Sequence, residues 1–150
     1  MNAMDSLKNG LPFLKMHGLG NDFVIIDARA AENPVTVEMA KAIGHRYFGV
    51  GFDQLAVLTS SDAADVDVAF WNSDGSMAGA CGNASRCIGR LLIEETGKSA
   101  VSLRTNRGIL LVQDVDGDLL SVNMGQPQLN WRDVPLSQEV DLTTLPIDGA

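Results

Sequence analysis

The alternation of hydrophobic and polar residues predicts a series of short β-strands separated by turns. Residues 65–71 alternate with period two, which places Val66, Val68 and Phe70 on one face of a strand. Other runs rich in β-forming residues end at turn signals such as glycine and asparagine. The predicted strands are residues 12–17, 23–27, 54–58, 65–71, 101–105, 109–115 and 119–124, of which the last three form a meander.

Two segments repeat their hydrophobic residues at helical spacing instead. The first is predicted over residues 37–47, with Thr36 as its N-cap. The second begins directly after Cys81 and ends at Gly97, a residue type that commonly terminates helices. Many short strands combined with two helices predict an α+β domain with a mainly antiparallel sheet.

Composition limits the range of functions. A chain of 150 residues with 45% hydrophobic residues is long enough for one domain with a core. A net charge of −8 without a basic stripe argues against a nucleic-acid partner. No apolar run approaches the roughly 20 residues of a membrane span, and no signal peptide is recognisable. We therefore predict a cytoplasmic protein without a membrane partner, and a disordered leader over residues 1–10.

Three potential ligand-binding motifs do not meet the requirements of their chemistry. The Gly18–Gly20 turn lacks the third glycine and the helix of a dinucleotide site, because Phe23 and a strand follow. Aligning Gly75 with the glycine of a calcium loop puts Cys81 where a bidentate glutamate belongs. His17 has no second ligand nearby in the sequence. We predict neither a metal site nor a cofactor.

Cys81 is the candidate for chemistry. It lies at a predicted helix start, where unpaired N–H groups and the helix dipole favour a thiolate over a thiol. The alternative is an inert, buried thiol, since free cysteines are commonly buried. Cys87 lies on the apolar stripe of the same helix and is predicted to be a packing residue. The sequence leaves open the roles of His17 and Arg86.

Several segments together resemble the diaminopimelate epimerase family. They occur in the family's order at residues 15–23, 48–55, 71–76, 81–83 and 122–127. Between Asn83 and Arg86 this chain has Ala84 and Ser85, where the family usually has glycine and alanine. Both are small residues compatible with a helix, so the substitution should be tolerated.

The resemblance implies an enzyme that interconverts LL- and meso-diaminopimelate, for lysine and peptidoglycan precursor synthesis, without pyridoxal phosphate or metal. One cysteine thiolate removes the α-proton and a second cysteine reprotonates the opposite face. By motif, Cys81 corresponds to one catalytic cysteine. The residues that correspond to substrate contacts are Asn21, Gln54, Asn72, Gly82 and Asn83.

The resemblance also implies a lobe with a curved, mainly antiparallel sheet or barrel around a central helix, plus a second helix. We expect residues 11–127 to form the N-terminal lobe and residues 128–150 to begin a second lobe, which carries the second cysteine in the family. Residues 1–150 alone should then be inactive, and the resemblance is compatible with a homodimer of the full-length enzyme. The alternatives are a related two-lobed isomerase of the proline racemase or phenazine type, or a non-catalytic binding domain.

Overall fold

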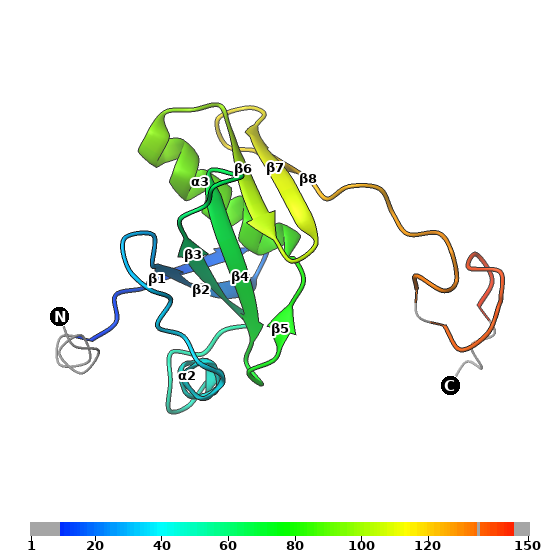
Figure 1. Cartoon of the computed structure of the whole chain (residues 1–150), viewed down its shortest axis with the longest axis horizontal. Coiled ribbons are helices and arrows are strands. Elements are labelled where there is room, and N and C mark those ends of the chain that lie inside the picture. Colours follow the sequence, from blue (N-terminus) through cyan, green and yellow to red (C-terminus); the bar gives the residue numbers. More distant parts are fainter. Residues whose placement is uncertain (1–9, 135, 146–150) are drawn as a thin grey trace.

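The computed structural model describes residues 10–134 and 136–145 (Figure 1). Within these residues, one eight-stranded sheet has a helix on each of its faces. The strands are β1 (Leu14–Gly18), β2 (Asn21–Asp27), β3 (Gln54–Thr59), β4 (Val66–Asn72), β5 (Met77–Ala78), β6 (Ala100–Thr105), β7 (Gly108–Asp114) and β8 (Leu120–Asn123). The helices are α2 (Val37–Gly44) and α3 (Gly82–Thr96).

The sheet is mixed but mainly antiparallel. Its strands follow the order β1-β2-β3-β4-β6-β7-β8, and β5 pairs with β4 beside this path. Only the pairs β2–β3 and β4–β6 are parallel among the described strands. Parallel neighbours need a crossover connection, and here α2 makes the first crossover while β5 and α3 make the second. This arrangement confirms the predicted α+β class and the curved sheet around a helix.

The two helices cover opposite faces of the sheet and create two hydrophobic cores. The larger core joins α3 to one face, with Phe23, Phe70 and Ile88 all fully buried. The smaller core lies under α2 and includes Val24 and Phe52. Strand β2 is covered on both faces and is buried at four successive positions, whereas β7 alternates between buried and exposed residues. Burial along each strand therefore follows the number of covered faces.

The first hairpin is tighter than the sequence pattern predicted. Strand β2 begins at Asn21 rather than residue 23, because Gly18 pairs with Asn21 and leaves only Leu19 and Gly20 in the turn. Both turn residues have positive φ angles, 57° and 86°, as a two-residue hairpin of the I′ type requires. The hairpin thereby places Asn21 at the very end of the sheet.

The first helix ends three residues earlier than predicted, at Gly44 instead of Tyr47. His45 is extended, and its ring nitrogen Nδ1 accepts hydrogen bonds from the backbone N–H groups of Tyr47 and Phe48. These side-chain bonds replace the helical pattern with a turn. The predicted N-cap is confirmed, since Thr36 accepts a hydrogen bond from the Met39 N–H group at 3.3 Å.

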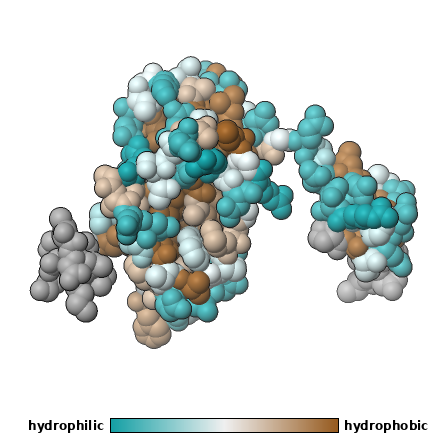
Figure 2. Space-filling view, viewed as in Figure 1, coloured by the Kyte–Doolittle hydropathy of each residue, from teal (hydrophilic) through white to brown (hydrophobic). Residues whose placement is uncertain are grey.

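The residues after β8 run away from the sheet (Figure 1). Residues 124–134 and 136–145 form turns and coil, and hydrophilic residues dominate their visible surface in Figure 2. The division at residues 127 and 128 stays a prediction, and most of the expected leader lies outside the described residues. No helix in the described part of the chain is long and apolar enough to cross a membrane.

Candidate functional site

The register of the sheet gathers three of the predicted contact residues at one end. Strands β2 and β3 run parallel and begin at this end, with Asn21 and Gln54 as their first residues. Strand β4 is antiparallel to β3 and finishes there, with Asn72 paired to Gln54. The pairing of the strands thus brings Asn21, Gln54 and Asn72 to one end of the sheet, although they lie about 18 to 51 positions apart in the sequence.

The same three side chains lie on the face of the sheet that carries α3. Alternate residues of a strand share a face, so Asn21 lies on the face of Phe23, and Asn72 lies on the face of Phe70. Phe23 and Phe70 both belong to the core under α3. Along each strand, the amide residue therefore lies next to the last core residue on this face, at the edge of the larger core.

The N-terminus of α3 meets this end of the sheet. Cys81 is the N-cap residue of α3, with no side-chain capping hydrogen bond among the described residues. Gly82 and Asn83 form the first turn, and the Asn83 Nδ2 atom lies 3.5 Å from the Asn21 Oδ1 atom. The predicted helix start at Cys81 is confirmed, and the fold brings Cys81, Gly82 and Asn83 to the same sheet end as the other amides.

The amide groups of this site are only partly satisfied. The Gln54 Nε2 atom donates to the Asn72 Oδ1 atom over a long 3.4 Å, while Asn72 Nδ2 donates to the Ser76 hydroxyl at 2.9 Å. The Gln54 Oε1 atom is buried and has no hydrogen-bond partner among the described residues. Buried polar groups are nearly always paired in folded proteins, so an unpaired amide oxygen marks a place with binding capacity left over.

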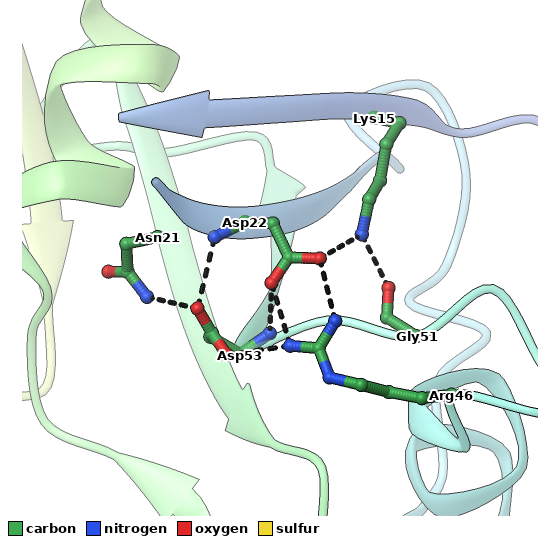
Figure 3. A network of polar contacts seen from close by, with 6 residues as sticks. All are labelled: Lys15, Asn21, Asp22, Arg46, Gly51 and Asp53. Atoms are coloured by element: carbon green, nitrogen blue, oxygen red, sulfur yellow. Dashed lines mark hydrogen bonds and ion pairs between the residues drawn. The ribbon is translucent and has the colours of Figure 1, made fainter. Parts of the chain in front are cut away.

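A network of charged side chains supports the site from outside (Figure 3). The Asp53 carboxylate accepts hydrogen bonds from the Asn21 Nδ2 atom at 2.6 Å and from the Asp22 N–H group at 3.1 Å. Arg46 bridges Asp22 and Asp53 at 2.8 and 2.7 Å, and Lys15 binds Asp22 at 2.7 Å. The Arg46 guanidinium, with help from Lys15, holds the pKa of the Asp22 carboxyl well below its usual range.

The two cysteines have different surroundings. Cys81 is half-buried at the edge of the larger core, whereas Cys87 is buried within it. Burial raises the pKa of the Cys87 thiol, which agrees with its predicted role in packing. His17, Arg86 and Cys87 border an open hollow of about 560 Å³ between β1 and the segment before β8. Arg86 also donates a hydrogen bond to the Asn83 Oδ1 atom.

The sequence interpretation overlooked the supporting role of Asp53, Asp22 and Arg46 behind the site. Asp22 and Asp53 lie directly beside Asn21 and Gln54 in the segments that resemble the family, so a signal was present. Their connection through Arg46 depends on how the turn after α2 folds back, which local patterns do not reveal. In the described residues, no group of three or more His, Cys, Asp or Glu side chains is arranged to hold a metal ion.

Comparisons with known proteins identify the family of the chain. The family profile described as "Diaminopimelate epimerase" matches residues 13–130. A diaminopimelate epimerase from Phenylobacterium zucineum is 43% identical over 138 residues, which cover 92% of this chain and 50% of the relative. One from Gluconobacter oxydans is 47% identical over 142 residues, covering 93% and 53%. The chain thus spans about half the length of these relatives.

Solved structures show the same fold at low sequence identity. A hydroxyproline epimerase from Agrobacterium vitis superposes with a TM-score of 0.55 at 17% identity, covering 73% of this chain and 40% of that one. At this identity the superposition shows a shared fold and nothing more. The family profile and the two relatives, in contrast, match the amino-acid sequence over most of the chain. The chain belongs to the diaminopimelate epimerase family.

Proposed function

We propose that this chain supplies one half of the active site of an enzyme that interconverts LL- and meso-diaminopimelate. The observation that carries the proposal is that the α3 N-terminus, with Cys81, meets the Asn21 amide at the same end of the sheet where Gln54 and Asn72 lie. Family membership supports diaminopimelate as the substrate. The reaction belongs to lysine and peptidoglycan precursor synthesis.

Cys81 is the proposed acid/base group for one face of the substrate α-carbon. In one direction its thiolate takes the α-proton, while a second thiol on the opposite face gives a proton to the same carbon. In the reverse direction the two groups exchange roles, so the proton count is unchanged over a cycle. Such a pair is needed because a base on one face cannot return the proton to the other.

The second thiol is not Cys87, because this residue is buried in the core beneath α3. We place it in the part of the related enzymes that this chain does not span. Residues 1–150 alone should then fail to epimerise the substrate, since only one face of the α-carbon would have an acid/base group.

The remaining site residues are proposed to bind the substrate. The first N–H groups of α3, at Gly82 and Asn83, suit a carboxylate because helix N-termini attract anions. The amides of Asn21, Gln54 and Asn72 offer both donors and acceptors. A diamino dicarboxylate has a carboxylate and an ammonium group at each end, and needs both kinds of partner.

Exchange of the substrate α-proton in heavy water tests the assignment of Cys81. In the full-length protein, Cys81→Ala should abolish epimerisation and the exchange that passes through its face of the substrate. Cys87→Ala is the matched control, because it removes a thiol from the same helix away from the amides. It should lower stability while exchange continues. Exchange and turnover at the wild-type rate in Cys81→Ala would exclude Cys81 as the acid/base group.

A further inference from the structure

The orientation of the Asn21 side-chain amide is fixed by its hydrogen bond to the Asp53 carboxylate, which lies behind the site. A carboxylate accepts hydrogen bonds but has none to donate, so only the NH₂ group of Asn21 can face Asp53. The 2.6 Å contact between Asn21 Nδ2 and Asp53 Oδ2 therefore defines the amide without ambiguity. The amide oxygen must point the other way, and it faces Asn83 on α3 (Figure 3 shows the Asp53 side).

The amide opposite is fixed by the reverse logic. A guanidinium group donates hydrogen bonds and accepts none, so Arg86 must face the oxygen of Asn83. The Asn83 NH₂ group is thereby turned toward Asn21. Asp53 thus orients the Asn21 amide of β2 so that its oxygen faces the site as an acceptor. Arg86 orients the Asn83 amide of α3 so that its NH₂ group faces the site as a donor.

The contact between these two amides is the weakest in the chain of hydrogen bonds. The Asn83 Nδ2 and Asn21 Oδ1 atoms are 3.5 Å apart. The hydrogen bonds and the ion pair of the Asp53 carboxylate are shorter, at 2.6 to 3.1 Å. A 3.5 Å contact is near the limit of hydrogen bonding and contributes little. A ligand can therefore replace the inner contact while the outer contacts keep both amides in orientation.

We propose that Asp53 is a positioning residue that holds the Asn21 amide oxygen toward the substrate. Arg46 and the Asp22 N–H group keep the Asp53 carboxylate in place, at 2.7 and 3.1 Å. Asn21 then presents an acceptor suited to a substrate ammonium group. The inference rests on the proposed function, since it assigns one polar group of that active site.

A double-mutant cycle in the full-length protein tests whether Asp53 acts through Asn21. Asp53→Asn keeps the shape but replaces one carboxylate oxygen with an NH₂ group. Asn21 then faces either that donor or a neutral carbonyl oxygen, so the charge-assisted hydrogen bond that fixes its amide is lost in both rotamers. We expect kcat/KM to fall about tenfold in the wild-type background. In the Asn21→Ala background the same substitution should change kcat/KM by less than about twofold. Equal losses in both backgrounds would show that Asp53 does not act through Asn21.

Asp65→Asn is the matched control. Asp65 also accepts from a backbone N–H group, at 2.7 Å from Ser102, and from a cationic side chain, but it lies outside the site. This variant should leave kcat/KM unchanged. A loss like that of Asp53→Asn would attribute the effect to general destabilisation and overturn the proposal.

Proton exchange of the Asn21 side-chain amide gives a readout independent of catalysis. Its NMR signals are assigned by their disappearance in Asn21→Ala. They should exchange slowly in the wild type and in Asp65→Asn, and at least about tenfold faster in Asp53→Asn. Unchanged exchange would overturn the role of Asp53. If the wild-type protein does not epimerise diaminopimelate, the proposed function fails, and this measurement still decides whether Asp53 orients Asn21.

Discussion

The two ends of α3 differ in how completely their polar groups are paired. At the C-terminal end, Gly97 adopts the left-handed conformation and its N–H group bonds to the Ile93 carbonyl at 2.8 Å. Thr96 bonds to the Leu92 carbonyl, and Arg29 binds Glu95 at 2.9 Å. At the N-terminal end, the Cys81 side chain makes no capping hydrogen bond within the part of the chain that the structure describes.

The difference separates groups that stabilise the fold from groups that have binding capacity left. These C-terminal contacts are all made within the chain, so their loss should cost stability alone. The long amide contacts and the unpaired Gln54 oxygen at the N-terminal end offer the fold little. Their loss should cost ligand binding and turnover instead. Each of the following substitutions tests one side of this comparison.

The largest effect is expected at the N-terminal end, from Cys81→Ser. A serine hydroxyl is a far weaker acid than a thiol and does not supply the base, so kcat should fall by about 10²–10⁴-fold. Thermal unfolding should be nearly unchanged, because the two side chains differ little in size and Cys81 is only half-buried. Steady-state kinetics and a melting curve measure both. Loss of folding together with activity would contradict the division between the two ends.

Gly97→Ala should destabilise the C-terminal end of α3. Gly97 has a φ angle of 70°, and apart from its chain neighbours no atom of the described residues lies within 4 Å of the position an added Cβ would take. The cost is therefore backbone strain alone, about 1–2 kcal/mol of unfolding free energy. Gly97→Asn is the matched control and should cost less, because asparagine tolerates this conformation better. Urea denaturation measures the difference, and KM and kcat should stay at wild-type values.

Stability should also fall in acid through the ion pair beyond this helix end. The Lys98 ammonium, with hydrogen bonds from Ser102, lowers the pKa of Asp65 to about 2 from its usual 3.8. A carboxyl with a lowered pKa in the folded state stabilises the protein above about pH 4, and this contribution is lost as the pH falls toward 2. Asp65→Asn should flatten that part of the profile. An acid slope that stays unchanged in Asp65→Asn would contradict this contribution, and urea denaturation at several pH values measures it.

Arg29→Ala should have the smallest effect. Arg29 is 30% exposed and binds Asp27 and Glu95, whose side chains are about half exposed. Exposed ion pairs contribute about 0.2–1 kcal/mol, and one guanidinium is shared here, so the unfolding free energy should fall by less than about 1 kcal/mol, and by less still at high salt. Turnover should not change. A marked loss of turnover would show that the C-terminal end of α3 also serves catalysis.

Local patterns were sufficient to predict the parts of the fold that local chemistry determines. The bounds of α3 follow from Cys81 and Gly97, and the meander follows from turn signals at residues 106–108 and 116–117. The predicted end of α2 was wrong, because the His45 ring accepts hydrogen bonds from the backbone N–H groups that would have continued the helix. That competition depends on side-chain geometry, which hydrophobic spacing does not contain.

The site was predictable as a set of residues but not as an arrangement. Asn21, Gln54, Asn72 and Cys81 were identified by resemblance, and their roles stay predictions. Their meeting depends on the parallel pairing of β2 with β3 and on the register that sets Gln54 opposite Asn72. Such pairings join residues far apart in the sequence and follow from the whole fold. The position of Asp53 behind Asn21 was missed for the same reason, because the hydrogen-bond partners of Asp53 come from β2 and from the turn after α2.

Alkylation of the two cysteines tests most directly whether the N-terminal end of α3 is the ligand end. The full-length protein is treated with iodoacetamide near neutral pH, with and without diaminopimelate, and the modified peptides are measured by mass spectrometry. We predict that Cys81 reacts readily and is protected by diaminopimelate, and that Cys87 reacts slowly in both cases because it is buried. Equal labelling of both cysteines, or labelling of Cys81 that diaminopimelate does not reduce, would contradict the account.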